Sequence, residues 1–286
     1  MKILVTGALG QLGQEMRRLG EDSSHDFVFT DREELDITSA RAVDEGLSAG
    51  FDGVINCAAY TAVDKAETEK TLCYALNSEA VEILARACHR YGAFLVHIST
   101  DFVFDGRQFL PYRETDEPHP LSVYGSSKLE GEKRAFAVHD RVSVIRTSWL
   151  YSVYGNNFVK TMRRLLSEKP EVRVIFDQVG TPTCARTLAE VIVSHLDFWK
   201  EASQGIYHYS QEGVASWYDF AVAIRRFSGF KTPVVPIHTE EYPTPARRPH
   251  YSVLDKTKIK QAMGIGIPHW MDPLEQTIEE LSQGGK

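Results

Sequence analysis

The chain has 286 residues, 43% of them hydrophobic, and a formal net charge of −7 at pH 7. This length predicts one large α/β core with a smaller appended lobe rather than three full domains. The acidic balance argues against broad nucleic-acid binding, and no run of about 20 apolar residues predicts a membrane helix. The four cysteines (Cys57, Cys73, Cys88 and Cys184) lack CxxC spacing, so neither a disulfide nor a zinc site is expected.

The N-terminal MKILVTG leads straight into a strand pattern rather than a cleavable leader, which favours a cytoplasmic protein. Short apolar runs then alternate with amphipathic segments. Strands are expected at 2–7, 26–31, 52–60, 93–101 and 142–151, with helices at 11–20, 39–50 and 80–92.

This alternation requires parallel strands with right-handed crossovers. Residues 1–150 are therefore predicted to form a Rossmann-type doubly wound parallel sheet. Residues 151–286 are predicted to form a smaller, mixed α/β substrate-binding lobe, with some segments returning to the first domain. The proline-rich stretch 242–253 is expected to be a loop.

Three glycines follow the first predicted strand and open the first helix: Gly7, Gly10 and Gly13, with Gln11 and Leu12 between them. A strand-to-helix turn aims backbone N–H groups and the positive end of the helix dipole at one point, and glycines leave room there for a pyrophosphate. A plain tight turn is the alternative. The GxxGxxG spacing resembles the extended short-chain dehydrogenase/reductase superfamily, which implies a nicotinamide cofactor.

Asp31 and Arg32 follow the second predicted strand, where a residue facing the adenosine ribose is expected. Asp31 would accept a hydrogen bond from a free 2′-hydroxyl, whereas Arg32 would attract a 2′-phosphate. We therefore expect both NADH and NADPH to be used. A solvated turn is the alternative interpretation of this pair.

Tyr124 and Lys128 are four residues apart in a helical pattern, which places both on one face. A nearby ammonium lowers the pKa of a phenol toward the range useful for acid–base catalysis. Thr100, at the end of the fourth predicted strand, has a hydroxyl that can polarise a substrate carbonyl. We expect a catalytic set of Thr100, Tyr124 and Lys128; a chance YxxxK match and a strand-end turn are the alternatives.

Seven phrases together resemble one family within that superfamily: VTGALGQLG, NCAAYTAVDKAE, ISTDFVFDG, VYGSSKLEGE, RTSWLYSVYGNNFVKTM, DQVGTPT and RPHYSVLD. From end to end the chain resembles the dTDP-4-dehydrorhamnose reductases. The resemblance implies NAD(P)H-dependent reduction of the C4 keto group of dTDP-6-deoxy-L-lyxo-4-hexulose to give dTDP-L-rhamnose for cell-surface polysaccharide synthesis. Phe102 departs from the tyrosine that is more frequent in the family.

The resemblance also implies further site residues. Asp36 and Ile37 would flank the adenine, Lys128 would hold the nicotinamide ribose, and the cofactor would be lined by Ala58, Ala59, Tyr60 and Thr61. The substrate would meet Asp101, Thr100 and Tyr124, with Trp149 packed on the sugar and Arg248, or its neighbour Arg247, on the diphosphate. A core aromatic and a solvated loop charge are the respective alternatives for Trp149 and the arginine.

Some members of the family hold magnesium between carboxylates at a dimer interface, and Glu15 and Glu190 resemble two of those ligands. No third ligand is identified, so the metal stays unassigned, and a homodimer is compatible with the sequence. Two other functions remain open. One is a non-catalytic NADP-binding regulatory subunit, since the β subunit of methionine adenosyltransferase resembles the same family. The other is a sugar-nucleotide epimerase or dehydratase that recycles its cofactor.

Overall fold

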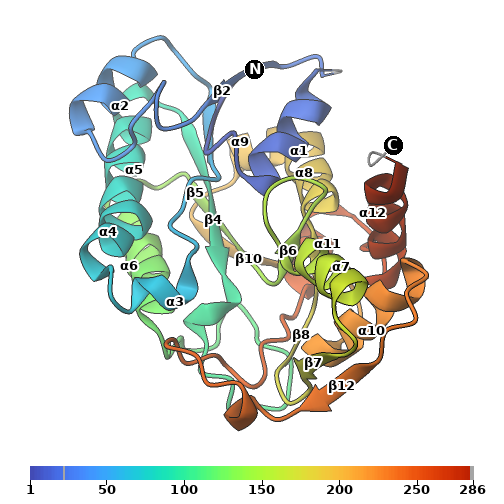
Figure 1. The fold of residues 1–286 in the computed structure, drawn as a ribbon. Coiled ribbons are helices and arrows are strands. Elements are labelled where there is room, and N and C mark those ends of the chain that lie inside the picture. Colours follow the sequence, from blue (N-terminus) through green and yellow to red (C-terminus); the bar gives the residue numbers. More distant parts are fainter. Residues whose placement is uncertain (22, 284–286) are drawn as a thin grey trace.

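The computed structural model describes residues 1–21 and 23–283. Its centre is a six-stranded sheet in the order β10-β5-β4-β3-β1-β2, in which each pair of neighbours is parallel (Figure 1). This topology confirms the expected Rossmann-type fold. The strands are β1 (Lys2–Thr6), β2 (Asp26–Thr30), β3 (Gly53–Asn56), β4 (Phe94–Thr100), β5 (Val142–Thr147) and β10 (Gly205–Tyr209).

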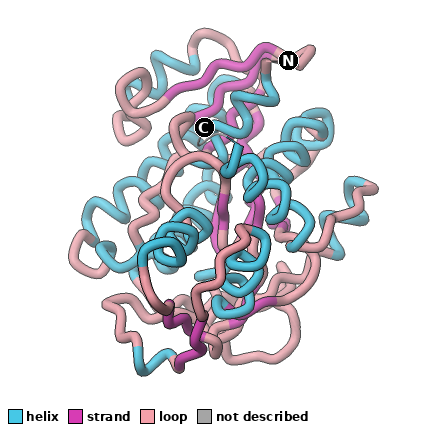
Figure 2. The backbone as a smooth tube through the Cα atoms, turned by 45° about the vertical axis from the view of Figure 1, so that its right-hand side comes forward, coloured by secondary structure: helices cyan, strands magenta, loops and turns pink. Residues whose placement is uncertain are grey.

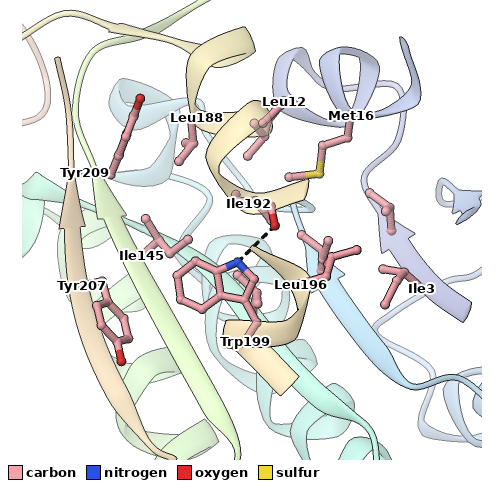
Figure 3. Close-up of a cluster of buried hydrophobic side chains, with 14 of the residues drawn as sticks. Ile3, Leu12, Met16, Ile145, Leu188, Ile192, Leu196, Trp199, Tyr207 and Tyr209 are labelled. Carbon is pink, nitrogen blue, oxygen red and sulfur yellow. Dashed lines mark hydrogen bonds between the residues drawn. The ribbon is translucent and has the colours of Figure 1, made fainter. Parts of the chain in front are cut away.

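Helices cover both faces of this sheet because its central strands are apolar on both sides. One face carries α1 (Gln11–Gly20), α8 (Ala185–Ser194) and α9 (Leu196–Glu201), and Trp199 anchors the core there by donating from Nε1 to the Ile192 carbonyl at 3.1 Å (Figure 3). The other face carries α2 (Ala40–Leu47), α5 (Ala80–Tyr91) and α6 (Val123–Val138).

Short helical segments occupy two connections beside the carboxyl ends of the strands. Between β3 and α5 lie α3 (Val63–Ala66), α4 (Lys70–Tyr74) and the π-helical segment η1 (Ala75–Glu79). After β4 comes the 3₁₀ segment η2 (Asp101–Val103). Such short segments place side chains at the edge where ligands of doubly wound folds bind.

The rest of the chain forms a smaller mixed lobe with its own aromatic core, beside the main sheet in both backbone views (Figures 1 and 2). Three short strand pairs belong to it: β6 (Leu150–Tyr151) with β9 (Thr183–Cys184), β7 (Val172–Ile175) with β12 (Val234–Ile237), and β8 (Val179–Gly180) with β11 (Ala215–Ser216). Its other elements are α7 (Phe158–Glu168), α10 (Trp217–Phe227), η3 (Thr239–Glu241) and α12 (Met271–Gln283). In contrast, α11 (Thr257–Met263) packs on the core of the main sheet through Ile259.

Segments beyond residue 150 also build the main sheet, because β10 pairs with β5 while α8 and α9 pack on its face. The functional division at residue 150 remains a prediction. All four cysteines are free thiols in the described ranges. In the same part of the chain, no helix combines the length and the apolar character needed to span a bilayer.

Candidate active site

The glycine-rich turn between β1 and α1 forms a cradle open to an anion. Gly7 has a φ of +68°, and a Cβ there would lie 2.5 Å from the Ala58 backbone nitrogen, so only glycine fits. Gly10 caps α1 without a side-chain hydrogen bond. Because the first N–H groups of a helix lack intrahelical partners, this turn suits a pyrophosphate.

A cavity of about 390 Å³ opens beside this turn. Eight of the residues predicted to bind the cofactor line it: Gly7, Gly10, Asp31, Arg32, Asp36, Ile37, Ala58 and Ala59. Of the other predicted residues, Leu12 and Gly13 are buried in α1, Tyr60 is buried, and Gln11 and Thr61 lie outside the cavity walls. Six lining residues were not anticipated: Leu35, Thr38, Cys57, Leu72, Ala75 and Leu76. The walls suit a nucleotide cofactor.

Asp31 is engaged with the backbone around it. Its carboxylate accepts from the Leu9 N–H at 2.9 Å and from the Arg32 N–H at 2.8 Å, which ties the glycine-rich turn to the end of β2. Arg32 is exposed and has no carboxylate within 4 Å among the described residues. Of the two side chains, Arg32 therefore keeps its hydrogen-bonding groups available for a ligand.

Arg32→Ala should raise the dissociation constant for NADPH by about tenfold and leave that for NADH within about twofold, because a guanidinium binds phosphate through charge-assisted hydrogen bonds. Fluorescence titration of both coenzymes on one preparation measures the two constants. Equal weakening of both coenzymes would show that Arg32 does not meet the 2′-phosphate.

Helix α6 brings Tyr124 and Lys128 to the carboxyl end of β4. Its N-cap, Ser122, accepts from the Gly125 N–H at 3.1 Å. A Cβ on Gly125 would lie 2.2 Å from the Phe102 carbonyl oxygen, so glycine permits the helix to approach this closely. The Phe102 ring meets the Tyr124 ring edge-on at 5.7 Å, which shows how this departure from the family pattern is accommodated.

The electrostatics of the pair differ from the simple expectation. Burial raises the pKa of Tyr124 to about 12, although the Thr100 hydroxyl beside it favours the phenolate. The Lys128 Nζ donates to the Ile98 carbonyl at 2.6 Å and lies 3.2 Å from His97 Nε2. The pKa of Tyr124 is thus raised rather than lowered in this arrangement, and Thr100 and Tyr124 lie together. The lowering of that pKa by Lys128 stays a prediction.

Asp101 is only 1% exposed, beneath the site rather than open to a ligand. Its Oδ1 accepts from the Thr100 hydroxyl at 3.2 Å, while Oδ2 has no partner among the described residues. Burial raises the pKa of Asp101 to about 6, although the Ser252 and Thr100 side chains favour the charged form.

Because folded Asp101 binds its proton more tightly than the unfolded chain, raising the pH from about 4 through 6 costs stability. Asp101→Asn removes this cost. The difference in free energy of unfolding between variant and wild type should grow in favour of the variant by up to about 3 kcal/mol between pH 4 and pH 7. Urea unfolding at several pH values measures it, and parallel curves for the two proteins would contradict the raised pKa.

Trp149, predicted to pack on the sugar, is half-buried and has a φ of +47°, a rare backbone conformation for a bulky residue. Its ring stacks on Trp217 with centroids 3.6 Å apart and planes 7° from parallel. One face is thus covered by α10, within the aromatic core of the smaller lobe. That face of the Trp149 ring is therefore part of the aromatic core. Contact of the opposite face with the sugar stays a prediction.

Arg248 does not stand free for a diphosphate. Its guanidinium makes a two-point ion pair with Asp64 on α3, at 2.8 and 3.0 Å, and also donates to Thr244. The proline-rich loop is thereby fastened across to the segment after β3. Arg247 is exposed and has no ion pair among the described residues. Of the two arginines, Arg247 is the one left available to an anion in this arrangement.

The carboxylates considered for magnesium do not fit a metal in this arrangement. Glu15 is 1% exposed and accepts from the Ser152 hydroxyl at 2.6 Å and from Arg186 Nε at 3.3 Å. A cation at Glu15 would face the Arg186 guanidinium, which also pairs with Glu280. Glu190 has its pKa raised by burial, with the Glu15 charge contributing. Arg186 thus supplies the positive charge at this site.

Asn77, in the π-helical segment, was not anticipated from the sequence. Its Oδ1 accepts from the Tyr60 N–H at 2.8 Å, and its Nδ2 donates to the Tyr60 carbonyl at 3.0 Å and to Ser127 Oγ at 3.1 Å. It therefore joins the end of β3 to the residue beside Lys128. No spacing or motif in the sequence distinguishes Asn77. By contrast, Asn56 and His97 can be recognised in the sequence, because each is a polar residue within an apolar strand run.

Comparison with known proteins agrees with this geometry. The family model for the RmlD substrate binding domain matches residues 1–283. The dTDP-4-dehydrorhamnose reductase of Aggregatibacter actinomycetemcomitans is 41% identical over 285 residues, covering 96% of this chain and 97% of the relative. The crystal structure of a dTDP-4-dehydrorhamnose reductase from Clostridium acetobutylicum has a TM-score of 0.95 and 43% identity, covering 99% of this chain and 100% of the other.

A dTDP-4-dehydrorhamnose reductase from Bacillus anthracis, solved in complex with NADP, has a TM-score of 0.92 and 38% identity, covering 98% of this chain and 99% of the other. These relatives are matched along nearly their whole length, and so is this chain. The chain belongs to the dTDP-4-dehydrorhamnose reductase family.

Proposed function

We propose that this protein is an NAD(P)H-dependent oxidoreductase that reduces the C4 keto group of dTDP-6-deoxy-L-lyxo-4-hexulose to give dTDP-L-rhamnose. The observation that carries the proposal is the convergence of Thr100, Tyr124 and the cofactor cavity at the carboxyl edge of the main sheet. The named activities of the full-length relatives support the same substrate.

A nicotinamide cofactor held in the cavity would supply hydride for the sugar C4, and the chain supplies the proton and the binding site. Tyr124 has a phenol that is protonated near neutral pH, because burial raises its pKa to about 12, so it donates its proton to the oxygen at C4. The Thr100 hydroxyl orients Tyr124 and the carbonyl. The glycine-rich turn would hold the pyrophosphate, and Arg32 would bind near the adenosine ribose.

A spectrophotometric assay of NADPH and NADH oxidation with the dTDP-4-keto sugar tests the proposal. We expect one coenzyme oxidised per sugar reduced. An epimerase or dehydratase would convert sugar without net coenzyme consumption. A regulatory subunit would bind NADPH and oxidise none. Either result would contradict the proposed reduction, and the intact Thr100 and Tyr124 favour the reductase over the regulatory subunit.

A further inference from the structure

A row of polar side chains crosses the main sheet beneath the site. Thr6, Asn56 and His97 are neighbours in the register of β1, β3 and β4, and each is at most 1% exposed. Lys128, on α6 and also 1% exposed, meets the end of this row. Buried polar groups are almost always hydrogen-bonded, so the row can be assigned donor by donor.

The orientation of the Asn56 amide is fixed by a group that can only donate. The Ala58 backbone N–H lies 3.1 Å from Asn56 Oδ1, and the Thr6 hydroxyl donates to the same oxygen at 2.7 Å. Turning the amide over would set its NH₂ group against the Ala58 N–H. Asn56 Nδ2 therefore faces His97 Nδ1, at 3.0 Å, and donates to it.

His97 Nδ1 is consequently an acceptor and carries no proton. Burial is the largest cause that holds the pKa of His97 well below its ordinary value, so the ring is neutral. Its single proton is then on Nε2, 3.2 Å from Lys128 Nζ. An ammonium there would set donor against donor, whereas a neutral amine accepts from Nε2 and still donates to the Ile98 carbonyl at 2.6 Å.

We propose that His97 is a positioning residue for Lys128, whose neutral amine it holds on strand β4 through an Nε2–H to Nζ hydrogen bond. The inference rests on the proposed function, because the sequence predicts that Lys128 acts with Thr100 and Tyr124 in that reaction. Glu132, Cys73 and Cys57 also face Lys128 and favour the ammonium, but burial outweighs them and lowers the pKa of Lys128 to about 8, so the neutral amine is the main form above that pH. Protonation ends the contact with His97 and releases Nζ to other acceptors.

Nuclear magnetic resonance titration of the free protein, with lysine labelled by ¹³C at Cε, reads the charge of Lys128 directly. The signal is assigned by its loss in Lys128→Met. We expect a wild-type midpoint near 8. In His97→Gln the side-chain amide can turn its oxygen toward an ammonium, so the midpoint should rise by about one pH unit or more. In His97→Phe, which offers no acceptor, it should not rise.

His208→Gln is the matched control, because His208 is also fully buried in the main sheet but bonds to the Tyr112 carbonyl at 3.0 Å. It should leave the midpoint unchanged. A wild-type midpoint near 10.5 would overturn the neutral amine. A midpoint in His97→Gln equal to wild type, or an equal rise in both His97 variants from general loosening, would overturn the role of His97.

If His97→Phe does not fold, the comparison of the Lys128 midpoint in His97→Gln with that in His208→Gln is sufficient to test the role of His97. The titration uses neither coenzyme nor sugar. A protein that fails the coenzyme-oxidation assay can therefore still show the His97 effect, and an active reductase can still lack it.

Discussion

Tyr124→Phe should lower kcat by about 100-fold or more, because it removes the proton donor and leaves the ring that packs on Phe102. Coenzyme affinity should change by less than about twofold, since Tyr124 lies outside the walls of the cofactor cavity. Steady-state kinetics with saturating sugar, together with a coenzyme titration, measure both effects. A loss of activity below about threefold would exclude Tyr124 as the acid.

Glu132→Gln should cost about 3–5 kcal/mol of stability, because it leaves a buried guanidinium without its counter-charge. Glu132 pairs with Arg146 through two contacts of 2.6 and 3.0 Å, and the two side chains are 2% and 1% exposed. Ser99 on β4 also donates to Glu132. The pair thus joins α6, which carries Tyr124, to β4 and β5. Urea unfolding measures the loss.

The control for this prediction is Glu45→Gln, which breaks an exposed ion pair with Arg41 and should cost less than about 1 kcal/mol. The double variant Glu132→Leu with Arg146→Met should recover part of the loss, since neither charge is then buried alone. A cost below about 1 kcal/mol for Glu132→Gln would show that the buried pair does not hold α6 in place.

The fold could be predicted because its signals are local and periodic. Five apolar runs with helical patterns between them require a parallel sheet. The glycine-rich turn is also recognisable, because the positive φ at Gly7 and its close approach to Ala58 require glycine. The sixth strand, β10, pairs with β5 from more than 50 residues further along the chain, and no local pattern assigns that partner.

The candidate site was predictable where one segment carries several site residues, as for Tyr124 with Lys128 and for Asp31 with Arg32. Pairs of residues that are far apart in the sequence and meet only in the folded chain could not be predicted. Arg248 was expected on a diphosphate, but it pairs with Asp64, 184 positions earlier in the chain. Likewise, the orientation of Lys128 depends on His97 and Asn56, whose side chains meet only through the register of β3 and β4.

Transfer of deuterium from NADPH that carries deuterium at both positions of the nicotinamide C4 tests the proposed reaction most directly. The labelled coenzyme is incubated with the protein and the dTDP-4-keto sugar, and the product is examined by nuclear magnetic resonance. The proposed reduction places one deuterium on C4 of the sugar for each NADP⁺ formed. A product without deuterium at C4, or sugar converted while the coenzyme stays reduced, would contradict it.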